Sequence, residues 1–178
     1  KPVYHRDFYP LMNGVTHVPF PDPYRPILDV KPGEDYGMKV VEYIEEQILG
    51  HLLPPEDVAG ILVEPIQGES GIVVPPEGYL RRLRSLADQH RALLVVDEIQ
   101  SGLGRTGTLF AFEHEGIRPD IVIVGKALSG GMYPVSAILA DDEVMGVFHP
   151  GQHGSTFGGN PLGAAIAREA LKVLVEED

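Results

Sequence analysis

Three short apolar runs in the middle of this 178-residue chain limit the folds that it can adopt. They cover residues 59–63 (AGILV), 92–96 (ALLVV) and 121–124 (IVIV), and none of them alternates with polar residues. Such runs are typical of strands buried on both faces, as in parallel sheets. Parallel strands need long crossovers between them. The pattern therefore predicts an α/β fold, a mainly parallel sheet with flanking helices and right-handed crossovers.

Helical spacing and turn residues predict the remaining elements. Helices are expected over 36–49, 77–90 and 109–114 and from 161 onward, and a further strand over 135–140. The last helix has the clearest start, because Asn160 can cap it and Pro161 suits its first position. Gly50 is expected to end the first helix.

Residues 1–35 hold seven of the 16 prolines. Proline fixes φ and lacks a backbone donor, so this segment is expected to be irregular chain that packs on the domain. Residues 36–178 are expected to contain the sheet, and the length fits a single domain overall.

The composition excludes several classes of function. With 14 Lys and Arg against 26 Asp and Glu, the formal net charge is −12, which argues against a nucleic-acid partner. The absence of Cys excludes disulfides, thiolate metal sites and a thiol nucleophile. The uncharged stretch 127–140 is too short to span a bilayer, so we expect no membrane partner. We expect a cytoplasmic protein without a metal, or one of the mitochondrial matrix if the source is eukaryotic.

Each of the three apolar runs is followed by a polar side chain. Glu64 follows the first and Asp97 the second, while Lys126 comes one Gly after the third. Ligands of open α/β sheets bind beyond the carboxyl ends of the strands, so these groups should converge on one rim. Taken singly, Lys126 could be a solvated lysine and Asp97 a turn cap. Together they predict a site, because burying either charge unpaired would cost several kcal/mol.

Two glycine-rich segments allow more than one interpretation. Residues 102–107 fit the G-x-G-x-x-G dinucleotide fingerprint, but five residues separate them from the preceding apolar run and no long helix is expected after them. We interpret them as a turn that tolerates positive φ. Residues 154–160 bring hydroxyls and backbone N–H groups to a helix N-terminus, which suits either an anion such as phosphate or a simple capping loop.

An amine, a carboxylate and a phosphate-suited loop on one rim match the needs of pyridoxal phosphate. A lysine amine forms a Schiff base with the cofactor aldehyde, and a carboxylate pairs with the protonated pyridine nitrogen. The same lysine, once released by substrate, can act as the base that moves a proton.

Several motifs resemble those of the class III pyridoxal-phosphate-dependent aminotransferases. They are EPIQGE at 64–69, VDEIQSG at 96–102, GRTG at 104–107, PDI at 119–121, GKALSGG at 125–131 and HGSTFGGNP at 153–161. The variant KALSGGMYPVSA at 126–137 most resembles ornithine aminotransferase-type members, whereas GVTHVP at 14–19 is closer to 4-aminobutyrate-type members. The resemblance implies part of the large domain of a fold-type I pyridoxal phosphate enzyme.

The resemblance also implies roles for individual residues. Lys126 would be the Schiff-base lysine, and Asp97 the partner of the pyridine nitrogen. Ile99 would press on one face of the ring, and Gln100 would hydrogen-bond the ring oxygen. Glu69 would pair with a substrate-binding arginine, whereas Glu64 receives no firm role.

A further pair of residues implies a partner. Thr156, with Ser155 beside it, would reach the phosphate of the neighbouring subunit's cofactor, which implies a homodimer with shared active sites.

The function implied by the resemblance is that of an aminotransferase. It would pass the terminal amine of an ornithine-like donor to a 2-oxo acid such as 2-oxoglutarate; a 4-aminobutyrate-type or acetylornithine-type enzyme is the alternative. The family's phosphate cup, ring-stacking aromatic and substrate-reading arginine are not in these residues. A second hypothesis is therefore a truncated, non-catalytic fragment of such an enzyme, and a third is nucleotide binding through 102–107.

Overall fold

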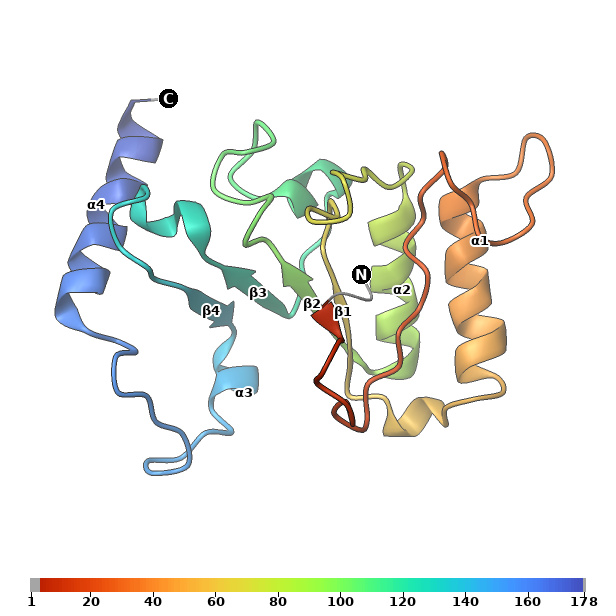
Figure 1. Cartoon of the computed structure of the whole chain (residues 1–178), viewed down its shortest axis with the longest axis horizontal. Helices are drawn as coiled ribbons and strands as arrows, with labels where there is room; N and C mark the ends of the chain where they lie inside the picture. Colours follow the sequence, from red (N-terminus) through yellow and green to blue (C-terminus); the bar gives the residue numbers. More distant parts are fainter. Residues whose placement is uncertain (1–3, 178) are drawn as a thin grey trace.

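Four strands form one sheet in the computed structural model, which describes residues 4–177 (Figure 1). The strands are β1 (Gly60–Val63), β2 (Leu93–Asp97), β3 (Ile121–Val124) and β4 (Ala137–Ala140), in the spatial order β1-β2-β3-β4. Strands β1, β2 and β3 are mutually parallel, and β4 runs antiparallel to β3. The predicted α/β fold with a mainly parallel sheet is confirmed, and the three apolar runs form its parallel strands.

The strand β4 is shorter than predicted and differs in direction from the others. It begins at Ala137 rather than at residue 135. The connection from β3 contains no crossover helix longer than four residues, and Gly130 and Gly131 both have positive φ. Parallel neighbours are usually joined through a crossover helix, and this turning connection has none of sufficient length, so the chain comes back antiparallel.

The helices lie close to the predicted positions. The first is α1 (Tyr36–Tyr43), which continues as the π-helix η2 (Ile44–Leu49) up to Gly50. The second, α2 (Tyr79–His90), starts later than predicted because Gly78 precedes it in a left-handed conformation. The last, α4 (Pro161–Glu176), is capped by Asn160, whose Oδ1 accepts a hydrogen bond from Gly163 N at 2.8 Å.

Shorter helices complete the chain. They are η3 (Pro55–Asp57), η4 (Ala111–Glu115), η5 (Lys126–Ser129) and α3 (Asp142–Met145). The expected helix over 109–114 is thus a 3-10 turn displaced by two residues at its start. The described residues contain no helix with the length and apolar character of a membrane span.

One face of the sheet is well buried and the other is not. Leu94 and Val96 lie in a core cluster with residues of α1 and α2. Val124 lies in a second cluster with residues of η5 and α4. On the opposite face, Leu62 is 66% exposed and Ile138 is 56% exposed. The prediction that the strands are buried on both faces is therefore wrong for the part of the chain described, because both core clusters lie on one face.

An ion pair ties the start of β3 to α2. Asp120 accepts hydrogen bonds from Arg84 Nη1 at 2.6 Å and from Leu94 N at 2.7 Å. Partial burial acts to raise the pKa of Asp120, but the hydrogen bonds from Arg84 and Leu94 and the charge of Arg84 outweigh it, so the pKa is lowered. Burial raises the pKa of the Tyr79 hydroxyl in the same core.

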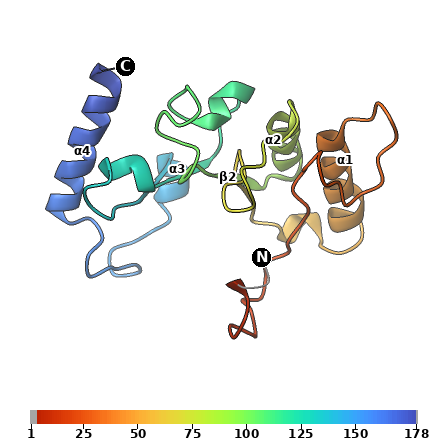
Figure 2. The ribbon, with the colours of Figure 1, turned by 45° about the horizontal axis from the view of Figure 1, so that its top comes forward.

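Residues 5–35 contain turns and bends but no strand or helix. Phe20 packs edge-on against Tyr79 with ring centroids 5.8 Å apart. The hydroxyl of Tyr36 accepts a hydrogen bond from Ile27 N at 2.9 Å. The residues before these contacts are largely exposed and extend away from the sheet (Figure 2).

Candidate active site

The turn that follows β2 carries the first group of expected site residues. Asp97 ends the strand half-buried, and its Oδ1 accepts a hydrogen bond from Ile99 N at 2.9 Å. The next residue, Glu98, is only 1% exposed. Its carboxylate accepts hydrogen bonds from Ser101 Oγ at 2.5 Å and from Phe112 N at 2.9 Å. The turn is thus held in place by its own side chains.

Lys126 follows β3 and opens η5. Its φ of 42° lies in the left-handed region, which is unusual for a residue other than Gly. Its Nζ donates a hydrogen bond to Gln100 Oε1. The side chain of Ile99 lies over Gly125, with both γ-carbons 3.5 Å from the point where a Cβ on that glycine would be. Ile99, Gln100 and Lys126 therefore form one group.

Sheet register explains why these residues meet. Asp97 in β2 pairs with Ile123 in β3, so Lys126 comes only three residues beyond the partner of Asp97. The carboxyl ends of these parallel strands lie at the same edge of the sheet. Asp97 and Lys126 thus follow neighbouring strands at one edge of the sheet, but their side chains line different cavities.

The loop after β1 also packs at this edge of the sheet. Glu64 Oε2 accepts a hydrogen bond from Gly68 N at 2.8 Å. Gln67 and Val73 pair as an antiparallel bridge, which folds the loop back on itself. Gly68 is buried beside the side-chain amide of Gln100. The β1 loop thus packs against the residue that holds Lys126.

Two cavities adjoin the rim. Asp97, Glu64 and Gln67 line one of about 230 Å³, together with Phe20 and Tyr79. A second, of about 1180 Å³, is lined by residues of the segment 133–137, the loop 157–160 and α4, and Lys126 borders it. Lys126 is thus one of the residues that line the larger cavity, whereas Asp97 lines the smaller one.

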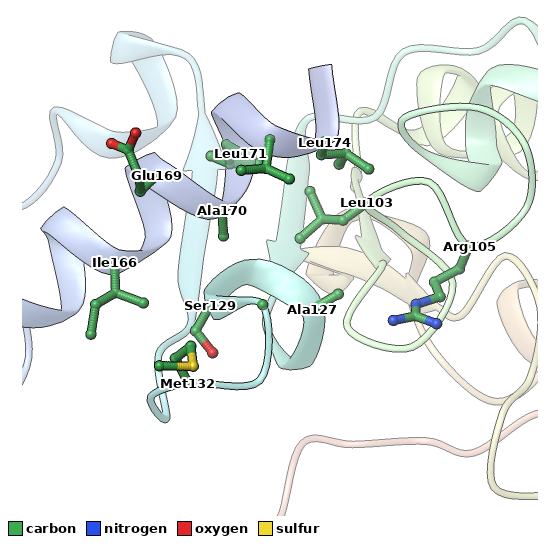
Figure 3. Close-up of a pocket in the computed structure, with 12 residues that line it drawn as sticks. Leu103, Arg105, Ala127, Ser129, Met132, Ile166, Glu169, Ala170, Leu171 and Leu174 are labelled. Carbon is green, nitrogen blue, oxygen red and sulfur yellow. The ribbon is translucent and has the colours of Figure 1, made fainter. Parts of the chain in front are cut away.

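A further cavity of about 520 Å³ lies between η5 and α4 (Figure 3). Its lining is mostly apolar, with Leu171 and Leu174 on α4 facing Leu103, and Arg105 at one end. Neither Asp97 nor Lys126 lines it. It is therefore separate from the rim.

Four expected site residues lie outside the group of Ile99, Gln100 and Lys126. Asp97 is at the end of β2 and lines the smaller cavity, and the other three lie on loops. Ser155 and Thr156 are exposed on the loop that leads into α4, where Ser155 Oγ accepts a hydrogen bond from Gly158 N at 2.8 Å. Glu69 is exposed at the tip of the β1 loop, and its Oε2 accepts a hydrogen bond from the Tyr4 hydroxyl at 3.2 Å.

The glycine-rich segment 102–107 forms a turn, as interpreted from the sequence. Leu103, Gly104 and Gly107 all have positive φ, and Leu103 N donates to Leu109 O at 2.7 Å. A dinucleotide site needs a helix to start directly after the glycines. Here the chain folds back on itself, so the geometry gives no support to nucleotide binding.

Two residues of the site were missed by the sequence analysis. Glu98 and Gly68 lay inside recognised motifs, but nothing indicated that one was buried under the turn and the other packed on Gln100. An acidic residue directly after Asp97, where the chain leaves a buried strand, was the available signal for the first.

The side chains present fit the ring end of pyridoxal phosphate. An amine, a carboxylate, a carboxamide and a branched apolar side chain come from two adjacent strand exits. These are the groups needed to bind an aldehyde covalently, to face a ring nitrogen, to hydrogen-bond a ring oxygen and to cover a ring face. The described residues hold no group of three or more His, Asp or Glu side chains suited to a metal ion.

Comparisons with known proteins agree with this geometry. The family model described as "Aminotransferase class-III" matches residues 1–178. "Ornithine aminotransferase 2" of Staphylococcus saprophyticus is 47% identical over 178 residues, which cover all of this chain and 39% of that protein. The chain thus spans about two fifths of the length of this relative.

Solved structures give the same result. The (S)-enantioselective omega-transaminase from Thermomicrobium roseum superposes with a TM-score of 0.88 at 32% identity, over 99% of this chain and 40% of its own. Acetylornithine aminotransferase from Elizabethkingia anophelis superposes with a TM-score of 0.70 at 54% identity, over 74% of this chain and 32% of its own.

Proposed function

The chain belongs to the class III aminotransferases, and from that premise we propose that it is the lysine-bearing part of an enzyme that transfers a terminal amino group. Enzymes of this family depend on pyridoxal phosphate. The observation that carries the proposal is the placement of the Lys126 amine against Gln100, next to the turn that begins at Asp97. We further propose that residues 36–178 are part of the cofactor-binding large domain and that 1–35 packs on it.

Each residue of the rim has a role in this proposal. Lys126 Nζ would hold the cofactor aldehyde covalently, and the Asp97 carboxylate would face the pyridine nitrogen. Ile99 would cover one face of the ring, and Gln100 would hydrogen-bond its oxygen. When bound, the cofactor supplies an electron sink for the bonds at the substrate carbon. Lys126 Nζ, once free, would move the proton at that carbon.

Two exposed elements would complete the site in an assembly. Ser155 and Thr156 would contact the cofactor phosphate of a neighbouring subunit, which makes a homodimer with shared sites part of the proposal. Glu69 would pair with an arginine that reads the substrate carboxylate. Their exposure in the single chain is consistent with partners that lie outside it.

For substrates, we propose an ornithine-like donor and a 2-oxo acid acceptor such as 2-oxoglutarate. The motif at 126–137 and the similarity to the staphylococcal ornithine aminotransferase support this donor. The similarity to acetylornithine aminotransferase supports an acetylornithine-type enzyme as the alternative. Measuring ornithine, N-acetylornithine and 4-aminobutyrate with one acceptor would separate the three.

The test of the lysine assignment is chemical trapping. Pyridoxal phosphate is added to the longest natural protein that contains this sequence, borohydride reduces the adduct, and the labelled peptide is mapped. The label is expected on Lys126. A label on Lys39, Lys172 or another amine, with Lys126 unmodified, would overturn the assignment.

A second candidate is a non-catalytic fragment that keeps the motifs by descent. The chain spans 39% of the length of the staphylococcal relative. Trapping of the cofactor on Lys126 of the 178-residue chain itself, together with transfer from any amine donor, would exclude this candidate. Failure of the short chain to bind, with binding by a longer form, would support it.

A further inference from the structure

We propose that Gly68 is a positioning residue for Lys126 and that it acts through Gln100. The absence of a side chain at Gly68 leaves the space in which the Gln100 amide lies, and that amide holds the lysine amine. The inference rests on the proposed role of Lys126 and adds to the rim a residue that touches neither the amine nor the ring.

A side chain at position 68 would meet Gln100. A Cβ on Gly68 would lie 2.5 Å from Cδ and 3.0 Å from Cγ of Gln100 and would overlap its terminal amide nitrogen. Carbon atoms in van der Waals contact lie 3.5–4.0 Å apart. An alanine at this position and the present Gln100 side chain are therefore incompatible, and one of them has to move.

The backbone around Gly68 is held on both sides. Its N–H donates to Glu64 Oε2 at 2.8 Å, and its carbonyl accepts from Gly71 N at 3.2 Å and Ile72 N at 3.1 Å. The bridge between Gln67 and Val73 is closed by two hydrogen bonds of 3.0 and 2.9 Å. Moving the main chain away from Gln100 would break several of these at once.

The backbone of Gln100 is held as well, whereas its side chain is held by its hydrogen bond with Lys126 and by packing on Gly68. The turn that carries it is fixed by the bond from Ile99 N to Asp97 and by the buried carboxylate of Glu98. The side-chain torsions of Gln100 are thus the cheapest response to a Cβ at position 68. A rotation that swings the whole amide clear of this Cβ also moves Oε1 and therefore disturbs its hydrogen bond with Lys126 Nζ.

A substitution at Gly68 should therefore affect Lys126 without affecting the stability of the fold. Gly68 has no positive φ, so alanine suits its backbone, and the fold should tolerate Gly68→Ala at little cost. The lysine should lose its acceptor. Glu64 also helps to position Lys126, because its carboxylate accepts a hydrogen bond from the N–H of Gly68.

The test compares Gly68→Ala, Gln100→Ala and the double variant in the longest natural protein that contains this sequence. Without cofactor, each is treated briefly with an amine-acylating reagent, and labelling of Lys126 is measured by mass spectrometry relative to the surface Lys39. Acylation needs the nitrogen lone pair, so the hydrogen bond to Gln100 has to open and the amine has to release its proton before it can react. Lys126 should therefore be labelled about tenfold faster in both single variants. The double variant should match Gln100→Ala.

Two further measurements show whether Gly68→Ala changes the fold or only the environment of Lys126. The thermal unfolding midpoint of Gly68→Ala should stay within about 2 °C of the parent. The pyridoxal phosphate concentration that half-saturates borohydride-trapped Lys126 should rise about tenfold. Acylation needs no cofactor, so it tests the coupling even if the trapped label maps to another residue and the proposed function fails.

Two results would overturn the inference while leaving the assignment of Lys126 intact. One is unchanged labelling in Gly68→Ala. The other is an effect of Gly68→Ala that is as large in the Gln100→Ala background as in the parent, because the route through Gln100 would then be wrong.

Discussion

Replacing the buried Glu98 by alanine should lower the free energy of unfolding by about 2–4 kcal/mol. The substitution removes the acceptor of Phe112 N, and a buried N–H without a partner costs about 1–3 kcal/mol. It also removes the partner of the Ser101 hydroxyl, a hydrogen bond worth about 1 kcal/mol. Because the side chain is 1% exposed, water does not readily replace either partner.

The assay is urea unfolding of the 178-residue chain at pH 7. With a slope of about 2 kcal/mol per molar urea, the midpoint should fall by about 1–2 M. Two variants serve as matched controls. Glu98→Gln keeps an acceptor for Phe112 N and can donate to Ser101, so it should shift the midpoint by about 0.5 M or less. Ser101→Ala leaves one buried oxygen of Glu98 without its donor but keeps the bond to Phe112 N, so it should shift the midpoint by about 0.5–1 M. A shift for Glu98→Ala no larger than that of Ser101→Ala would refute the reasoning.

Three further predictions concern the cofactor, acid stability and a helix start. Asp97→Asn keeps an acceptor for Ile99 N but loses the charge, so pyridoxal phosphate affinity, read by fluorescence titration, should fall at least about tenfold while the unfolding midpoint barely changes. The lowered pKa of Asp120 gives stability that is present above the ordinary carboxyl value of 3.8 and is lost as the pH falls through the lowered value. Asp120→Asn should therefore be less stable than the parent near neutral pH, and the difference should close in unfolding curves recorded below pH 3.8. Asn160→Ala should cost about 1 kcal/mol in thermal unfolding, whereas Asn160→Ser should keep most of the cap; equal losses would contradict the capping role.

The parallel strands could be predicted because unbroken apolar runs of four or five residues are typical of strands in the interior of a parallel sheet. The direction of β4 could not, because a strand carries the same side-chain pattern in either direction. The 3-10 helix η5 was missed since four residues are too few to show a helical period. The exposed Leu62 was also missed, because an apolar run does not show whether the described residues cover both of its faces.

The candidate site also combines features that the sequence predicts with features that it does not. The position of Asp97 and Lys126 at one edge of the sheet follows from strand order, since residues that end neighbouring parallel strands share an edge. The bond between Lys126 and Gln100 depends on side-chain torsions, and the contact of Gly68 with Gln100 joins loops 32 positions apart in the sequence. Neither leaves a local pattern. The contributions of Ser155, Thr156 and Glu69 stay predictions, because their proposed partners lie outside the chain.

The left-handed backbone at Lys126 bears on how this position can change over time. A side chain in that conformation costs on the order of 1 kcal/mol relative to glycine, the residue that adopts it freely. Selection for a higher free energy of unfolding would therefore favour replacement of Lys126 by glycine. Under the role proposed for Lys126, thermal stability and activity favour different residues at this position, so a screen for stability without a screen for activity would select against the lysine.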